Sequence, residues 1–393
     1  MIAAATLLAA TLAVTPASGA CALCHPDVRV EHERSAHGAE NVSCVACHGG
    51  DAAGVSVEAG HRGMRGVPRR RDIPALCAAC HSDISRMRPY NLPADQYALY
   101  QTSQHGRQLA KGDDRVAVCT DCHGVHDIRR PEDPASRVFP RNIPSTCAAC
   151  HADQERMRRY GIDAHAYEAY AVSVHGRALL EQGNGSAPDC ARCHGAHGAT
   201  PPGVGDVDKV CGQCHESARS AFLQGPHKSG MDAAGLPECA SCHQHHDIQP
   251  ATGELLDTVC LNCHAAGSGP LEVATSMQSL YGTASDEIDL AVALVDRASS
   301  IPLYVEDYRA RLAEARTALV ESLPMTHSLD VSRVRRLTDR ARSIAGEVEM
   351  EVNAKLAERW WRRVGLLVFW FYLLLTVAIL VRFRHRAAAE AHR

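Results

Sequence analysis

The 393-residue sequence has few of the side chains that usually fill a protein interior. It contains 5 Phe and 3 Trp, and aromatic residues make up 5% of the chain. This scarcity argues against a conventional core, because aromatic side chains contribute much of the buried area in such cores. The charges are also nearly balanced, with 41 basic and 45 acidic residues and a net charge of -4. The sequence therefore has no electrostatic footprint for nucleic acid.

Cysteine and histidine are abundant instead, with 18 Cys and 23 His, and each cysteine belongs to a C-x-x-C pair that a His follows directly. The nine motifs are Cys21, Cys24 and His25; Cys44, Cys47 and His48; Cys77, Cys80 and His81; Cys119, Cys122 and His123; Cys147, Cys150 and His151; Cys190, Cys193 and His194; Cys211, Cys214 and His215; Cys239, Cys242 and His243; and Cys260, Cys263 and His264. C-x-x-C-H is the attachment pattern of c-type haem, in which two thioethers fix the porphyrin and the His binds iron. Zinc ribbons need no His at that position, and a thioredoxin-like C-x-x-C would occur once. The sequence therefore predicts nine covalently bound haem c groups.

Nine haems within residues 21–264 leave about 27 residues for each. So little chain cannot wrap a haem in a fold of its own, so we expect the porphyrins to pack on one another and form much of the core. The fold class that follows is mainly α with much irregular structure. We expect short helices and loops with little sheet.

An internal repeat indicates which other histidines bind iron. A shift of 70 residues superposes residues 73–90 on residues 143–160, and the unit contains two motifs. Within it one extra His recurs in S-x-H-G, and another recurs three residues after the second motif. Shorter variants flank the unit, and His61 substitutes where the third position holds Asp51. The predicted distal iron ligands are His37, His61, His105, His126, His175, His197, His227 and His246.

Eight distal histidines leave the sixth ligand of the ninth iron open. His165 aligns with Asp95 in the sister repeat, so it is not a repeated feature. His32 and His327 remain as candidates, and a vacant coordination position is the third alternative. The sequence does not assign each distal His to a particular iron.

The two ends of the chain carry targeting signals. Residues 1–20 hold a short apolar run followed by small residues, which predicts a signal peptide. Residues 364–381 are free of charge and would form about 27 Å of helix, enough to cross a bilayer, with Trp and Arg at the borders. We therefore expect a transmembrane anchor at 359–383 in the bacterial cytoplasmic membrane. Since c-type haem is attached outside the cytoplasm, the nonahaem domain (21–267) would be periplasmic and the tail (384–393) cytoplasmic.

Residues 268–358 show apolar spacings of three and four, which predict a long helical hairpin. Leu323–Pro324 separates the arms, a kink at Ser300–Pro302 divides the first arm, and the second arm continues into the membrane span. In this arrangement the first arm begins near the membrane, so the ninth haem would face the membrane as an electron port. Alternatively, the hairpin is a stalk or a contact with a second copy of the chain.

The motifs of residues 21–264 resemble those of the periplasmic multihaem cytochromes c of anaerobic respiration. The resemblance implies electron transfer between the quinone pool, through an integral-membrane quinone-reactive subunit, and a soluble periplasmic redox partner, with no catalytic residue. Two alternatives stay open. One is reduction of a small nitrogen or sulfur oxyanion at a five-coordinate haem, although the C-x-x-C-K motif typical of multihaem nitrite reductases is lacking. The other is a structural scaffold in a larger respiratory complex.

Overall fold

The structure, a computed structural model, describes residues 19–199, 207–300 and 303–391. All of the expected signal peptide except residues 19 and 20 lies outside this part. The chain divides into two compact units. The first comprises residues 1–210 and 239–250, and the second comprises 211–238 and 251–393. The second unit therefore joins the seventh and ninth motifs to the C-terminal helices, whereas the expected domain boundary followed the ninth motif.

Short helices joined by loops form the first unit, and its described residues contain one isolated β-bridge, between Gly49 and Met64, and no strand. The expectation of a mainly α fold with much irregular structure is thus confirmed. The helices are α1 (Cys21–Cys24), α2 (Pro26–Glu33), α3 (Ala36–Ala39), α4 (Cys44–His48), α5 (Val57–Gly60), η1 (Arg70–Asp72), α6 (Ile73–His81), α7 (Ile84–Met87), η2 (Arg88–Tyr90), α8 (Gln96–Thr102), α9 (Gln104–Ala110), α10 (Cys119–His123), α11 (Ile143–His151), α12 (Gln154–Arg158), α13 (Ala166–Val172), α14 (Val174–Gly176), the π-helical turn η3 (Arg177–Glu181), α15 (Cys190–His194) and α19 (Ala240–His243).

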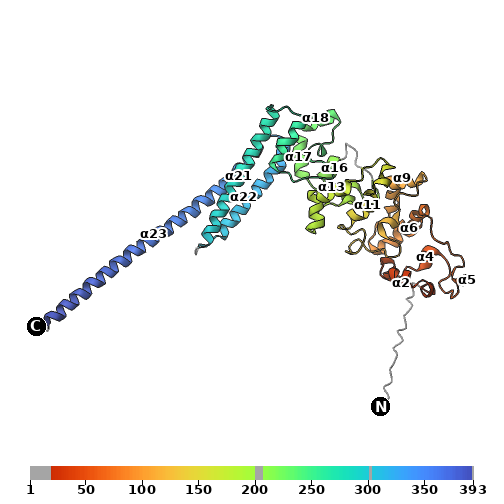
Figure 1. The fold of residues 1–393 in the computed structure, drawn as a ribbon, viewed down its shortest axis with the longest axis horizontal. Coiled ribbons are helices and arrows are strands. Elements are labelled where there is room, and N and C mark those ends of the chain that lie inside the picture. The colour runs from red at the N-terminus through yellow and green to blue at the C-terminus, as the bar shows by residue number, and fades with distance from the viewer. Residues whose placement is uncertain (1–18, 200–206, 301–302, 392–393) are drawn as a thin grey trace, which may run out of the picture. The chain divides into compact units, whose positions relative to one another are not determined.

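The second unit combines short helices with three long ones (Figure 1). Helix α16 (Val207–Gly212) crosses the division between the units. The others are α17 (Glu216–Gln224), α18 (His227–Ala234), α20 (Gly253–Val259), η4 (Cys260–Asn262), α21 (Gly269–Ser299), α22 (Glu306–Met325), η5 (Thr326–Ser328) and α23 (Val331–Ala391).

The 70-residue repeat is a repeat of local structure. Helices α6 and α11 each have proline in the first turn, where its missing N–H leaves no hydrogen bond unmade. Asp83 and Asp153 then cap the next helix of each copy by accepting backbone N–H groups. Equivalent residues thus start and stop equivalent helices, and each copy presents its motif at the end of a two-turn helix.

Helices α21, α22 and α23 pack as a three-helix bundle around a seam of small and branched residues that includes Ile288, Ala315 and Val348. Four ion pairs between the helices show the direction in which each helix runs: Arg316–Asp289, Arg309–Asp296, Arg340–Glu314 and Arg311–Glu351. Along α22 the residue numbers fall as those of α21 and α23 rise. Helix α22 is therefore antiparallel to both of its neighbours, and α21 and α23 run in the same direction. The hairpin of α22 and α23 is present, but the first arm, which was expected to kink at Ser300–Pro302, instead reverses direction between α21 and α22.

This reversal overturns the expected position of the ninth motif. Arg342 pairs with Glu287, so the start of α21 lies level with η5, at the end of the bundle where α23 begins. From there to Trp360 the helix rises roughly 45 Å. Since α20 packs on α21, the ninth motif lies far from the apolar end of α23, and the proposal of a membrane-facing port at this haem is wrong.

Beyond the bundle α23 continues alone (Figure 1). Its apolar part, within Val331–Ala387, is the one segment of the described residues that is long and apolar enough to cross a membrane, and no residue of that stretch is buried. A single helix therefore supplies both an arm of the bundle and a segment that is consistent with a membrane anchor.

Candidate haem sites

Three of the motifs share one backbone design, a single helical turn that ends on the motif His. In α4, α10 and α15 the His is the last helical residue, and a glycine with positive φ follows it. At Gly124, for example, φ is 87° and a Cβ would lie 2.4 Å from the carboxylate of Asp127. Glycine is needed for this turn because other residues are strained at such φ values. The chain thus turns sharply after the motif His. As a result, the residue three positions after the His lies near the motif.

The thiols of the motifs are available for thioether formation. In the described part of the chain all 18 cysteines are thiols rather than halves of disulfides. In the second to sixth motifs the two cysteines and the His lie within one helix. This arrangement fits covalent attachment of a porphyrin beside an imidazole that can reach its iron.

The two cysteines of a motif differ in exposure. The first cysteine is partly buried in all nine motifs, and the second is partly buried in four and exposed in five. The partly buried second cysteines are Cys80, Cys122, Cys150 and Cys242, and the exposed ones are Cys24, Cys47, Cys193, Cys214 and Cys263. Haem attachment at each of these cysteines stays a prediction.

Consecutive attachment sites adjoin. The first cysteines of neighbouring motifs lie within hydrogen-bonding reach in three places: Cys21 and Cys44, Cys77 and Cys119, and Cys147 and Cys190. The second cysteines Cys47 and Cys122 are near enough to interact electrostatically with Cys80 and Cys147 of the following motifs. The first six motifs thus form an unbroken series of neighbours.

An arginine of each repeat contacts the second cysteine of its own motif. The guanidinium of Arg156 lies 2.8 Å from Sγ of Cys150, and that of Arg86 lies 3.4 Å from Sγ of Cys80. Each arginine stands six residues after its cysteine and opens the repeated R-M-R sequence. The repeat therefore places a positive charge beside equivalent attachment sites.

Opposite at least seven of the motif histidines within the described residues, the structure places a second imidazole. The ring pairs, with centroid separations of 6.0–6.4 Å, are His25–His61, His81–His37, His48–His126, His151–His105, His123–His197, His194–His246 and His264–His227. These pairs include seven of the eight predicted distal ligands, all but His175. They also include seven of the nine motif histidines.

These separations match a metal ion held between two imidazoles. Two nitrogens on opposite sides of one metal, each about 2 Å from it, put the ring centroids roughly 6 Å apart. The adjacent rings of His245 and His246 are closer, with centroids 4.7 Å apart, and leave no space for a metal between them. The seven gaps therefore fit one iron each.

The environment of these rings favours the neutral imidazole. Burial lowers the pKa of His123 to about 4, and the facing His197 adds to the effect. Burial also lowers the pKa of His197, His105 and His151. A metal binds the neutral form of His, so an environment that disfavours the protonated ring favours ligation.

The pairs follow a fixed order along the chain. The His three residues after the fourth motif faces the second motif, and the same rule links His197 to the fourth and His246 to the sixth. The S-x-H-G histidines run the other way, so that His105, before the fourth motif, faces the fifth. Each repeat therefore exchanges imidazoles with the repeats before and after it.

The S-x-H-G motif itself is a helix start. Its serine hydroxyl accepts a hydrogen bond from the backbone N–H of its glycine, at 2.9 Å for Ser103 and Gly106 and 3.0 Å for Ser173 and Gly176. At Gly106 a Cβ would lie 2.0 Å from the carbonyl oxygen of Tyr100, so no other residue fits without a shift. The motif thus fixes the turn on which the His projects.

Two tyrosines of the repeat hold the segment before the next motif. Tyr100 donates a hydrogen bond from its hydroxyl to the carbonyl of Ala117 at 2.9 Å, and Tyr170 does the same to Pro188 at 2.9 Å. Each acceptor lies two residues before the cysteine that opens the following motif. The sequence shows these tyrosines as repeated residues, but their partners could not be predicted because they lie 17 and 18 residues away in a loop.

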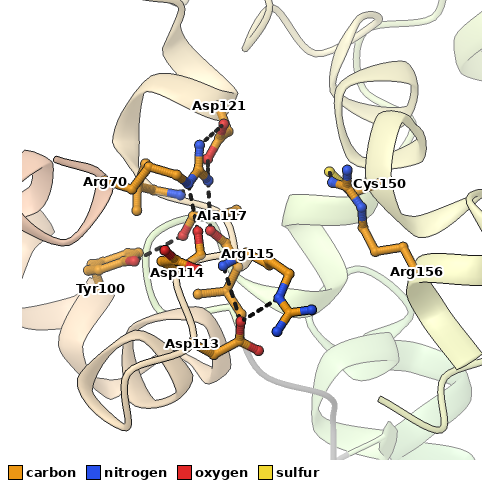
Figure 2. A network of polar contacts seen from close by, with 11 residues as sticks. Arg70, Tyr100, Asp113, Asp114, Arg115, Ala117, Asp121, Cys150 and Arg156 are labelled. Carbon is orange, nitrogen blue, oxygen red and sulfur yellow. Dashed lines mark hydrogen bonds and ion pairs between the residues drawn. The ribbon is translucent and has the colours of Figure 1, made fainter. Parts of the chain in front are cut away.

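Arg70 ties the fourth motif to the end of the preceding loop (Figure 2). Its guanidinium donates to the carboxylate of Asp121 at 2.6 Å and to the carbonyls of Asp114 and Val116 at 2.7 and 2.9 Å. Asp121 lies inside the motif and also accepts the backbone N–H of Val118 at 2.7 Å. The role of Arg70 was not predicted from the sequence, because a proline occupies the equivalent position in the sister repeat.

Comparison with known proteins agrees with this chemistry. The family model for cytochrome c554 and c-prime matches residues 210–284, which contain the last three motifs. The high-molecular-weight cytochrome c of Nitratidesulfovibrio vulgaris (strain Hildenborough) is 24% identical over 200 residues, or 47% of this chain and 33% of that protein. The chain thus matches about a third of the length of this relative. No solved structure matches. Both similarities support a multihaem c-type cytochrome with covalently bound haem c.

Replacing Gly106 with Ala tests the S-x-H-G design. We expect the Cβ to push the first turn of α9 away from the Tyr100 carbonyl and move His105 off its position opposite His151. One iron per chain should then become high-spin in electron paramagnetic resonance (EPR). Gly185→Ala is the control, since a Cβ there meets no atom within 4 Å. An unchanged spectrum of the Gly106 variant would contradict this role.

Replacing Arg70 with Gln tests the charge balance at the fourth motif. We expect a lower reduction potential for the haem at Cys119 and Cys122, because the uncompensated Asp121 carboxylate stabilises the more positive ferric state. Arg70→Lys should shift the potential less, and adding Asp121→Asn to Arg70→Gln should restore it. Spectroelectrochemical titration of the purified chain measures these potentials. Equal potentials in the wild type and both single variants would refute the assignment.

Proposed function

We propose that the chain is a membrane-anchored periplasmic cytochrome that carries electrons in anaerobic respiration through nine haem c groups. It would exchange electrons with the quinone pool through an integral-membrane partner and with soluble periplasmic acceptors. The row of opposed imidazoles, 6.0–6.4 Å between centroids, carries the proposal.

Ligation by an imidazole on each side suits electron transfer rather than substrate chemistry. When bound, each haem would supply a one-electron couple between ferric and ferrous iron. The motif His and the distal His would both bind the iron and would leave no position on it for a substrate. Besides these pairs, the described residues contain no group of three or more Asp, Glu, Cys or His side chains that could hold a metal ion.

The adjoining attachment sites support a relay. Thiols of successive motifs lie near one another from the first motif to the sixth, so porphyrins attached there would be neighbours in the same order. No acid or base is needed for electrons to pass along such a series. The scarcity of aromatic side chains is consistent with porphyrins that fill the space between the helices.

The geometry of the second unit supports a separate membrane partner. The ninth motif lies at the end of the bundle from which α23 rises roughly 45 Å before its apolar part begins. This distance separates its site from quinones dissolved in the bilayer. The proposed anchor would therefore hold the cytochrome at the membrane, while a partner subunit would carry out the quinone chemistry.

Two adjacent histidines give a matched test of ligation. His246 faces His194, whereas His245 is exposed and contacts His246. We expect His246→Ala to convert one iron per chain to the high-spin state and His245→Ala to leave all irons low-spin. EPR of the purified ferric protein measures both. If the two variants gave the same spectrum, His246 would not be a ligand.

The full-length chain in detergent tests the function as a whole. We expect a denatured mass that contains nine haems, low-spin signals only, and reoxidation of the reduced protein by a soluble acceptor cytochrome. In proteoliposomes menaquinol alone should not reduce the haems. A high-spin signal that shifts with nitrite or hydroxylamine would favour a reductase with a five-coordinate haem. Haems that neither accept nor release electrons would favour a scaffold.

A further inference from the structure

The predicted ligand set of the proposed cytochrome is one His short on the distal side. Seven ring pairs take seven irons, and the irons at His215 and His243 take their distal ligands from the remaining histidines. The predicted His175 is one, since it occupies in S-x-H-G the place that His105 has in the sister repeat. The other must come from the histidines outside the motifs and outside the predicted set.

Two of these histidines are engaged in ways that do not suit ligation. His165 is 65% exposed and its Nδ1 lies 2.6 Å from the carboxylate of Asp163, which stabilises its protonated form. The pKa of His165 is raised accordingly by this hydrogen bond. His245 is exposed and packs against His246 with no room for an iron between the rings.

His32 lies in a neighbourhood whose irons already have two imidazoles. Its charge would act on His37 and His126, which face His81 and His48 respectively. Its buried Nδ1 has no hydrogen-bond partner within the described residues, so it remains the rival candidate. A ligand there would be a third imidazole beside two complete pairs.

His327 is held as metal-binding histidines are held. It lies in η5, and its Nδ1 is 3.0 Å from the carbonyl oxygen of Pro324. A carbonyl only accepts hydrogen bonds, so Nδ1 carries the hydrogen and the neutral ring has its lone pair on Nε2. In metal-binding histidines, a hydrogen bond from the ring nitrogen that does not bind the metal orients the imidazole and fixes its tautomer. The motif His48 shows the same arrangement, with Nδ1 3.2 Å from the carbonyl of Gly66.

The turn that carries His327 is also packed against a haem-motif segment. Helix α17 begins directly after the seventh motif and contacts both η5 and α22. A Cβ at Gly225, the residue after α17, would lie 2.8 Å from the carbonyl oxygen of His327. Leu329 closes the turn in the left-handed conformation, with φ of 55°. These contacts fix the backbone of η5 beside the chain that leaves the seventh motif.

We propose that His327 is the ninth distal haem ligand and that it serves the iron held by His215, which lies in the same compact unit. The inference rests on the haem ligation proposed above. The tip of the hairpin that leads to the membrane segment is then bound to an iron. The hairpin of α22 and α23 would thereby take part in haem binding.

Replacing His327 with Gly in the full-length chain tests the assignment. We expect one high-spin ferric iron per chain by EPR, and added imidazole should return it to the low-spin state. The haem content, measured from the denatured mass, should stay that of the wild type. Ser328→Ala is the matched control, because it removes the hydrogen bond to the Met325 carbonyl from the same turn and leaves the imidazole in place.

Three outcomes would overturn the proposal. His32→Gly could produce the high-spin iron while the His327 variant stays low-spin, which would transfer the role to His32. The wild type could already contain one high-spin iron, which would show a vacant position. Ser328→Ala could give the same high-spin signal as His327→Gly, which would indicate a disturbed turn rather than a lost ligand. In each case low-spin signals from the other eight irons would leave the proposed electron-transfer function standing.

Discussion

The separation between facing imidazoles is the constraint on which the proposed haem sites depend. Two rings must face each other with their centroids roughly 6 Å apart, and seven pairs in the structure satisfy this requirement. Packed rings can lie at similar separations, but each of these pairs joins a motif His to a histidine predicted as a distal ligand. The short helices, the sharp turns after the motif histidines and the helix-capping serines all serve to place rings. In the first unit the secondary structure is arranged around these ring pairs, whereas the helical bundle of the second unit packs around an apolar core.

The order of the pairs makes the repeats interdependent. Because His126 faces His48 and His105 faces His151, a two-motif unit completes its neighbours and is completed by them. An isolated unit would lack distal ligands on both sides. Neighbouring units must therefore assemble together, much as the repeats of a solenoid protein bury their surfaces against adjacent repeats. The result is a chain of sites whose spatial order follows the sequence.

The sequence sufficed for what local spacing determines, and it failed where long-range packing decides. The motif spacing and the recurring S-x-H-G placed the seven distal histidines that the structure brings opposite motif histidines. Their assignment to particular partners required the fold, because each partner lies in another repeat. The direction of α21 was missed because apolar periodicity shows that a helix is buried, not which way it runs. The loop carbonyls that accept hydrogen bonds from Arg70 and Tyr100 could not be predicted, because backbone acceptors leave no trace in side-chain patterns.

The bundle gives the second unit a polarity with functional consequences. Helix α23 buries Val334 and Val348 near its start and exposes apolar residues near its end. The same helix therefore packs against protein at its start and has an apolar surface suited to lipid at its end. Since the ninth motif adjoins the start of α21, at the opposite end from the apolar segment, the proposed haem there and the lipid are separated by the length of the bundle. A redox centre held so far above a membrane cannot draw electrons from the bilayer interior unaided. The same stalk that would anchor the cytochrome therefore also sets the height that a partner must reach.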